Sequence, residues 1–170
     1  MKTQLWWIDG PWQGRLAIAA RPRGGDWLSD ELLGFRRVGV DIIVSLLAEE
    51  EVAEFGLSMQ AALCSTHGLK FVWFPIADRS VPASRGAALD LVRELDKALA
   101  AGKRIAIHCR QGIGRSGLLA ACLLCAAGID PDAAIQRVSA ARGCPVPETP
   151  EQRKWASDFA AELASSLPRE

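Results

Sequence analysis

The residues best suited to chemistry lie in one short segment, 108–116, whose sequence is His-Cys-Arg-Gln-Gly-Ile-Gly-Arg-Ser. Cys109 and Arg115 are six positions apart in it, and Gly112 and Gly114 lie between them. An apolar stretch that predicts a strand precedes the segment, and one that predicts a helix follows it. A loop that leads into a helix N-terminus presents backbone N–H groups and the positive end of the helix dipole to an anion. The sequence therefore predicts a phosphate-binding loop that carries a thiol nucleophile.

The chemistry predicted for this loop is attack of a thiolate on phosphorus, with a cysteinyl-phosphate intermediate. Thiols at helix N-termini ionise more readily than free thiols, so we expect Cys109 to be the nucleophile and a thiolate at neutral pH. The planar guanidinium of Arg115 can grip two phosphate oxygens, which share the charge of the transition state. We expect the Ser116 hydroxyl to point at the Cys109 sulfur, and His108 to fix the loop through backbone hydrogen bonds rather than act as a base. The residues predicted to bind phosphate are Arg110, Gln111, Gly112, Ile113, Gly114 and Arg115.

A second segment, 74–82, can supply the proton that the leaving group needs. It follows an apolar strand, contains Pro75 and Pro82 near its ends, and has Asp78 as its only acid. We expect Asp78 to protonate the leaving oxygen in the first step and to activate water in the second. The alternative is a surface aspartate that caps a turn.

The last predicted helix opens with a capping pattern. Thr149 can cap it, Pro150 suits its first turn, and Gln152 stands where a capping box has its glutamine. These roles explain the pattern structurally. The functional alternative is that Gln152 positions the hydrolytic water, and the motif alone leaves both open.

Other interpretations of the loop fit less well. Segment 112–117 satisfies G-x-G-x-x-G, but a dinucleotide site needs a following strand with an acidic residue, and here further helices follow. A Walker-type loop needs a lysine before Ser116, and the residue there is Arg115. A core cysteine beside a solvated arginine is the purely structural alternative.

The elements that must position these residues follow a regular alternation. Apolar runs predict strands at Leu5–Ile8, Arg15–Ala19, Asp41–Leu46, Lys70–Pro75 and Arg104–His108. Helices are predicted at Ser29–Val38, with Ser29 as cap, and at Ser84–Ala101, Arg115–Ala127, Pro131–Arg142 and Pro150–Ser166. This pattern predicts an α/β fold with a central, mostly parallel sheet of about five strands flanked by helices, and a helical C-terminal third.

Length and composition set broad limits. The 170 residues suit a single domain, 1–170, and 20 basic residues balance 20 acidic ones, so bulk charge does not favour nucleic acid or membrane. The five cysteines form an odd number, which favours a reducing compartment, and we expect a cytoplasmic monomer. No signal segment is expected, and the longest apolar run, 118–129, is too short to span a bilayer.

Segments 108–116, 74–82 and 147–152 together resemble the cysteine-dependent protein tyrosine phosphatase superfamily, within its compact atypical dual-specificity group. The resemblance implies a metal-independent hydrolase without cofactors, with Cys109 as nucleophile, Arg115 as phosphate clamp and Asp78 as general acid. It also raises Gln152 to a water-positioning residue. The acid segment lacks the Trp-Pro-Asp form of the larger tyrosine-specific enzymes, and the chain has no tyrosine with which to build their recognition loop.

The resemblance implies a dual-specificity protein phosphatase acting on Tyr and Ser/Thr side chains, whose site can also take a phosphate or sulfate ion. Alternatives are a phosphatase for a non-protein phosphate, such as a phosphoinositide or an RNA 5′-phosphate, and a phosphopeptide-binding module without turnover. Arg110, Gln111 and Arg79 can form a cationic rim that favours acidic substrates. One of four other cysteines can trap an oxidised Cys109. These are Cys64, Cys122, Cys125 and Cys144.

Three expectations concern residues outside the motifs. The run Glu49–Glu51 predicts a solvated helix start. Trp73 is expected to pack in the core. Trp6, Trp7 and Trp12 are expected to pin the N-terminal segment.

Overall fold

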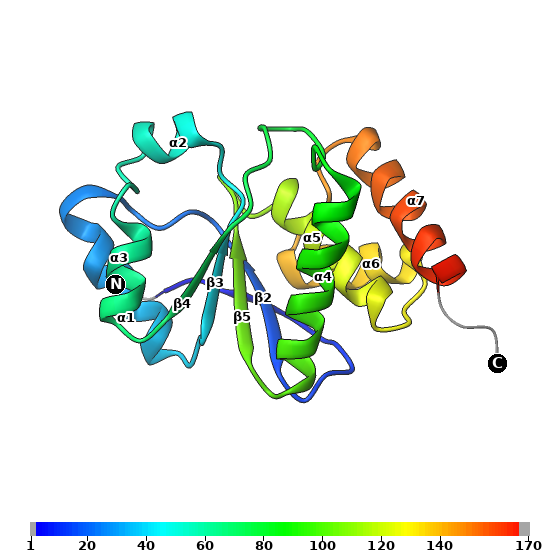
Figure 1. Cartoon of the computed structure of the whole chain (residues 1–170), viewed down its shortest axis with the longest axis horizontal. Helices are drawn as coiled ribbons and strands as arrows, with labels where there is room; N and C mark the ends of the chain where they lie inside the picture. Colours follow the sequence, from blue (N-terminus) through cyan, green and yellow to red (C-terminus); the bar gives the residue numbers. More distant parts are fainter. Residues whose placement is uncertain (1–2, 167–170) are drawn as a thin grey trace.

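A computed structural model describes residues 3–166 of the chain. Five strands form one sheet in the order β1-β2-β5-β3-β4, in which β1 is antiparallel to β2 and the other pairs are parallel (Figure 1). The predicted α/β class and mostly parallel sheet are confirmed. The strands are β1 (Trp6–Ile8), β2 (Arg15–Ala19), β3 (Ile42–Ser45), β4 (Lys70–Trp73) and β5 (Arg104–His108).

Helices cover both faces of the sheet (Figure 1). One face carries α4 (Arg85–Ala100), α5 (Arg115–Ala126), α6 (Pro131–Arg142) and α7 (Pro150–Ser166), and the other carries α1 (Leu28–Arg37) and α3 (Gln60–Thr66). Each face has its own apolar cluster. Alternate residues of the central strands supply the two clusters, since successive side chains of a strand point to opposite faces: Ile105 and Ile107 join the first, and Ala106 joins the second.

The topology brings three loops to one edge of the sheet. β3, β4 and β5 are adjacent and parallel, so the segments that follow them leave from the same end. The segment after β3 leads into α2 (Glu49–Glu54), the segment after β4 contains Asp78, and the loop after β5 contains Cys109. Candidate catalytic residues that are far apart in sequence therefore meet at the carboxyl ends of the strands.

Two predictions about packing are wrong. Trp73 is 48% exposed because β4 is the edge strand of the sheet, and its indole Nε1 donates to the Leu47 carbonyl at 2.8 Å. Ser29 does not cap α1, because that helix begins one residue earlier, and its hydroxyl instead bonds His67 Nε2 at 2.9 Å.

The aromatic residues near the N-terminus pin that segment as expected. The Arg142 guanidinium lies 3.8 Å from the ring centroid of Trp6, and Trp12 Nε1 donates to Asp96 at 2.9 Å. Trp7 packs partly buried under the guanidinium of Arg15. Among residues 3–166, no helix combines the length and apolar character needed to cross a membrane.

Candidate active site

The loop after β5 is anchored by its carbonyl groups. His108 Nδ1 bonds the Cys109 carbonyl at 3.2 Å, and the Arg21 backbone N–H donates to the Arg110 carbonyl at 3.3 Å. The Arg142 guanidinium donates to the carbonyls of Gln111 and Gly112 at 3.3 and 3.0 Å. With its carbonyls turned outward to these donors, the loop turns its amides inward.

The inward amides are free to bind an anion. Within residues 3–166, the N–H groups of residues 110–114 have no protein acceptor. They lie at the N-terminus of α5, whose dipole adds positive potential. This arrangement of unsatisfied donors is suited to the oxygens of a phosphate.

Gly112 allows the loop to lie against β2. Its φ is +71°, and a Cβ at this position would lie 2.8 Å from the carbonyl carbon and oxygen of Ala19. A larger residue would meet backbone rather than a flexible side chain. The glycine therefore sets how closely the loop approaches the sheet.

The Cys109 thiol, the predicted nucleophile, lies in the loop after β5 beside Ser116. Cys109 is 3% exposed, and its sulfur lies 3.2 Å from the Ser116 hydroxyl oxygen. The thiol lines a cavity of about 130 Å³ whose walls also include Asp78, Arg110 and Arg115. The predicted residues Gln111, Ile113 and Gly114 line the same cavity.

Arg115 lies at the base of this site with a 2% exposed side chain. Its NH1 and NH2 atoms bond the two carboxylate oxygens of Glu51 at 2.5 and 2.9 Å, and NH1 also donates to the Ile76 carbonyl at 2.8 Å. NH2 donates to Asp78 Oδ1 at 3.1 Å. Burial alone would lower the pKa of Arg115, but the hydrogen bonds to Glu51 and the nearby carboxylates outweigh it and raise the pKa. The guanidinium is therefore charged.

Glu51 is the site residue that the sequence analysis missed. The first turn of α2 was expected to be solvated, yet Glu51 is 6% exposed and also accepts from the Ala48 N–H at 3.0 Å. Burial would raise the pKa of Glu51, but its bonds with Arg115 and Ala48 outweigh that effect and lower it. The only signal was position, since Glu51 follows β3 as Asp78 follows β4.

Asp78 faces the cavity, as expected for a proton donor. Its carboxylate is 44% exposed and pairs with Arg115 at 3.1 Å, and Arg110 NH1 lies 3.8 Å from it. Its neighbour Arg79 adopts φ +59° and pairs with Glu148 across the cavity mouth at 2.6 Å. Part of the proposed cationic rim is therefore paired with carboxylates.

Gln152 makes the contacts of a capping box. Its side-chain oxygen accepts from the N–H groups of Glu148 and Thr149 at 3.1 and 3.2 Å, and the Thr149 hydroxyl accepts from the Gln152 N–H at 3.1 Å. Its amide nitrogen donates to the Ser80 carbonyl at 2.9 Å. Gln152 thus ties α7 to the Asp78 segment and is fully buried behind the cavity wall. A role in positioning water stays a prediction.

His108 supports the loop as a neutral residue. Burial lowers its pKa to about 4, and the charges of Arg115 and Arg21 act in the same direction. With Nδ1 donating to the Cys109 carbonyl, Nε2 accepts from the Gln60 amide at 2.9 Å. Gln60 went unrecognised because α3, whose first residue it is, was not predicted.

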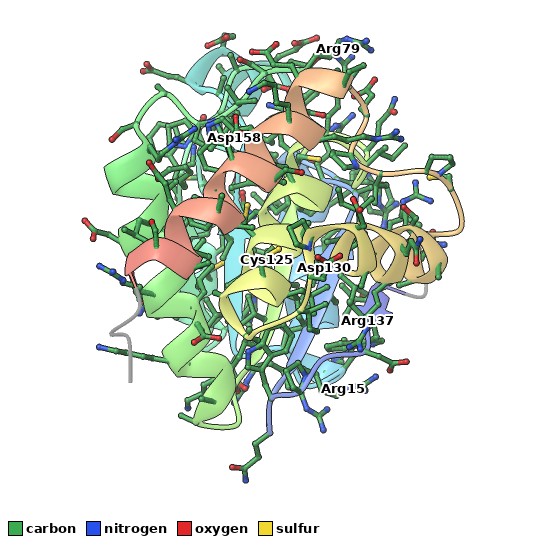
Figure 2. The ribbon with its side chains drawn as sticks, turned by 90° about the vertical axis from the view of Figure 1, so that its right-hand side faces the viewer. Arg15, Arg79, Cys125, Asp130, Arg137 and Asp158 are labelled. Carbon is green, nitrogen blue, oxygen red and sulfur yellow. The ribbon has the colours of Figure 1, made fainter. Side chains whose placement is uncertain are left out.

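The other cysteines differ from Cys109 in their surroundings. Burial raises the pKa of Cys64 to about 12 and that of Cys125 to about 11, and it raises the pKa of Cys122 well above its ordinary value. All described cysteines are free. Cys125 lies at the end of α5 opposite the loop, well below Arg79 in Figure 2. A disulfide between Cys109 and any of them stays a prediction.

Comparison with known proteins identifies the architecture. Residues 18–129 match the family model Tc-R-P, described as a polymorphic toxin system DSP-PTPase phosphatase. The chain belongs to this family. It is a member of the cysteine-dependent protein tyrosine phosphatase superfamily, and the predicted resemblance is confirmed.

Three relatives show how far the likeness extends. Cyclin-dependent kinase inhibitor 3 of Rattus norvegicus is 28% identical over 131 residues, which cover 76% of this chain and 61% of that protein. The chain thus spans less than two thirds of the length of this curated relative. Tk-PTP in its active form is 26% identical with a TM-score of 0.76, covering 98% of this chain and 100% of that one. Kinase associated phosphatase with serine at its catalytic-site cysteine shares the fold with a TM-score of 0.89, at 23% identity over 98% of this chain and 99% of that one.

Proposed function

We propose that this chain is a phosphomonoester hydrolase that dephosphorylates protein side chains through a cysteinyl-phosphate intermediate. The observation that carries the proposal is the junction of β5 and α5, where the Cys109 thiol and the Arg115 guanidinium lie at the two ends of a loop with unsatisfied amides. Family membership supports the same chemistry.

In the first step the Cys109 sulfur forms a bond to phosphorus while the bond to the leaving oxygen breaks. Asp78 gives its proton to that oxygen. Arg115 and the amides of residues 110–114 neutralise the three equatorial oxygens. NH1 of Arg115 is committed to Glu51 and Ile76, and NH2 gives one hydrogen to Glu51. The phosphate therefore takes the Nε hydrogen and the second NH2 hydrogen, which bonds Asp78 in the free protein.

In the second step water attacks phosphorus, Asp78 takes its proton, and the sulfur–phosphorus bond breaks. Ser116 lies close enough to donate its hydroxyl hydrogen to the departing sulfur. Gln152 is our candidate for positioning the water, through the amide hydrogen that its bond to Ser80 leaves unused.

The substrate we propose is a phosphorylated protein side chain of either the tyrosine or the serine/threonine type. The cavity of about 130 Å³ is small and, with no tyrosine in the chain, has no deep tyrosine-lined wall. We further propose that residues 1–170 form a single metal-independent domain that acts as a monomer in the cytoplasm. Five free cysteines support a reducing compartment.

The proposal is tested with purified protein and aryl phosphates without added metal. We expect turnover by the native chain, loss of more than about 10³-fold for Cys109→Ser, and acid-quench trapping of phosphate on Cys109 alone. Cys144→Ser is the matched control, because this partly buried thiol lies outside the cavity lining. Absence of turnover by the native protein, with phosphopeptide binding retained, would instead indicate a binding module.

A further inference from the structure

We infer that Arg21 and Arg110 form a second anion site on the ring of Phe55, beside the catalytic cavity. It receives a second phosphate or carboxylate of a phosphopeptide substrate. The inference rests on the proposed function and names the substrate class of the same site: peptides in which another anionic side chain lies close to the phosphorylated one.

The geometry of the site is two guanidinium groups that share one aromatic ring. The guanidinium carbon of Arg21 lies 3.8 Å from the Phe55 ring centroid, and that of Arg110 lies 5.3 Å from it. The two carbons are therefore at most about 9 Å apart, the sum of these distances. A guanidinium carbon lies about 4 Å from the centre of an anion that it binds, so one phosphate or carboxylate contacts both groups when the two carbons are within about 8 Å. The Arg110 side chain is half exposed and can move to reach this separation.

The protein supplies few carboxylates to balance the positive charges of Arg21 and Arg110. Within residues 3–166, Arg21 pairs with no carboxylate, and the acid near Arg110 is Asp78, at 3.8 Å, whose other oxygen already pairs with Arg115. Arg23 provides a contrast in the same segment. It also lies over an aromatic ring, that of Trp27, but it bonds Glu31 through two nitrogens at 2.8 and 2.9 Å. Two like charges beside one ring, with only a shared carboxylate near one of them, favour an incoming anion.

The second site adjoins the first. Arg110 lines the catalytic cavity, and its carbonyl accepts from the Arg21 N–H. Asp78 lies between Arg110, at 3.8 Å, and Arg115, at 3.1 Å, so these two guanidinium groups are separated by the width of one carboxylate group. Because consecutive Cα atoms lie about 3.8 Å apart, this spacing suits side chains one or two residues apart in a peptide.

An extended peptide fits the surroundings better than a compact headgroup. Arg21 and Arg23 are two residues apart in a segment without helix, and each lies over an aromatic ring. The second of these rings belongs to Trp27, which is 58% exposed. The basic and aromatic surface therefore continues from the cavity along the segment before α1, as a binding surface for a chain.

The decisive variant is Arg21→Gln, because this side chain does not line the cavity. We measure kcat/KM on an aryl phosphate, on a phosphotyrosine peptide, and on the same peptide with phosphothreonine or glutamate one or two residues away. The native protein should prefer the doubly charged peptides by about tenfold or more at low salt, and the preference should fall as salt rises. Arg21→Gln should remove the preference and leave aryl phosphate turnover within twofold of native.

Arg23→Gln is the matched control, since its charge is already paired, and it should keep the preference. Equal losses by Arg21→Gln on singly and doubly charged peptides would overturn the inference, as would equal effects of the two variants. A preference for multiply phosphorylated inositol headgroups over peptides, lost in Arg21→Gln, would overturn the assignment to a peptide.

A binding measurement separates this inference from the proposed function. If the native protein turns over no aryl phosphate, the proposed function fails. Affinities of Cys109→Ser for the singly and doubly charged peptides then still report on the second site. Tighter binding of the doubly charged peptide, lost on adding Arg21→Gln, supports the site, and equal affinities refute it.

Discussion

The ion pair between Glu51 and Arg115 gives the sharpest test of how this site is held together. Glu51→Ala leaves a buried guanidinium without its two-point partner. Removing one member of a buried pair typically costs 3–5 kcal/mol, because the remaining charge is uncompensated. Arg115 keeps Ile76 and Asp78 as partners, so the lower end of this range applies.

The expected cost is therefore about 3 kcal/mol in the free energy of unfolding, or a Tm lower by about 6–12 °C for a chain of this size. The loss of kcat/KM should also be large, because a displacement of the Arg115 guanidinium by about 1 Å can lower the rate roughly 10²-fold. The measurements are chemical denaturation, thermal melting and kcat/KM on an aryl phosphate. Glu51→Gln, which keeps the side-chain volume, should give stability and activity between those of the native protein and Glu51→Ala.

The pH dependence provides a second check on the same pair. Because the pKa of Glu51 is lowered in the folded protein, its stabilising effect is present above its ordinary value of 4.5. The effect is lost as pH falls through the lowered pKa. The difference in the free energy of unfolding between the native protein and Glu51→Ala should therefore vary by no more than about 0.5 kcal/mol from pH 5 to 8. It should become smaller in more acidic solution.

Glu50→Ala is the control for this experiment. Glu50 is the exposed neighbour on the same helix, and surface substitutions of this kind usually stay within about 0.5 kcal/mol. If Glu51→Ala unfolds as the native protein does, or if Glu50→Ala costs as much, the ion pair does not hold the site as we argue.

Three further predictions concern the loop and the acid. Burial lowers the pKa of His108 from 6.5 to about 4, so the free energy of unfolding of the native protein should fall by on the order of 3 kcal/mol as pH falls from 6.5 to about 4. Denaturation curves should show that His108→Asn abolishes this loss and that His67→Asn does not. In Gly112→Ala the new methyl group meets the backbone of β2, whereas in Gly128→Ala it meets open space and only the positive φ is unfavourable. Gly128→Ala should therefore lower the free energy of unfolding by about 1–2 kcal/mol, and Gly112→Ala should lower it, and the Tm, clearly more. Asp78→Asn should lower kcat most for alkyl phosphates and least for nitrophenyl phosphate; an equal loss on both would exclude it as the acid.

The sequence could predict those parts of the fold that depend on local pattern. The bounds of β2, β5, α6 and α7 agree with the predicted ranges. Central strands buried on both faces are continuously apolar, and helix ends carry their own signals, as where the Ser84 side chain caps α4 and Gly102 follows it with positive φ. The loop with Cys109 is likewise a contiguous motif.

What could not be predicted depends on which strands are neighbours. Sequence order does not reveal that β5 lies between β2 and β3, or that β4 is an edge strand that leaves Trp73 exposed. Glu51 was missed for the same reason, since three consecutive acids look solvated until the register of β3 beside β5 places the third of them against Arg115.

The arrangement of the site also explains why stability and catalysis are linked here. A guanidinium that clamps a phosphate must be charged, yet Arg115 is almost fully buried, so it needs a permanent counter-ion that does not leave when substrate binds. In the proposed mechanism Asp78 cannot serve as that counter-ion, because it exchanges a proton with the substrate. Glu51 takes one hydrogen of NH1 and one of NH2, and leaves the Nε hydrogen and the NH2 hydrogen that bonds Asp78 for the phosphate. In this mechanism one carboxylate keeps the guanidinium charged while the other transfers protons, and each follows one of the adjacent parallel strands β3 and β4.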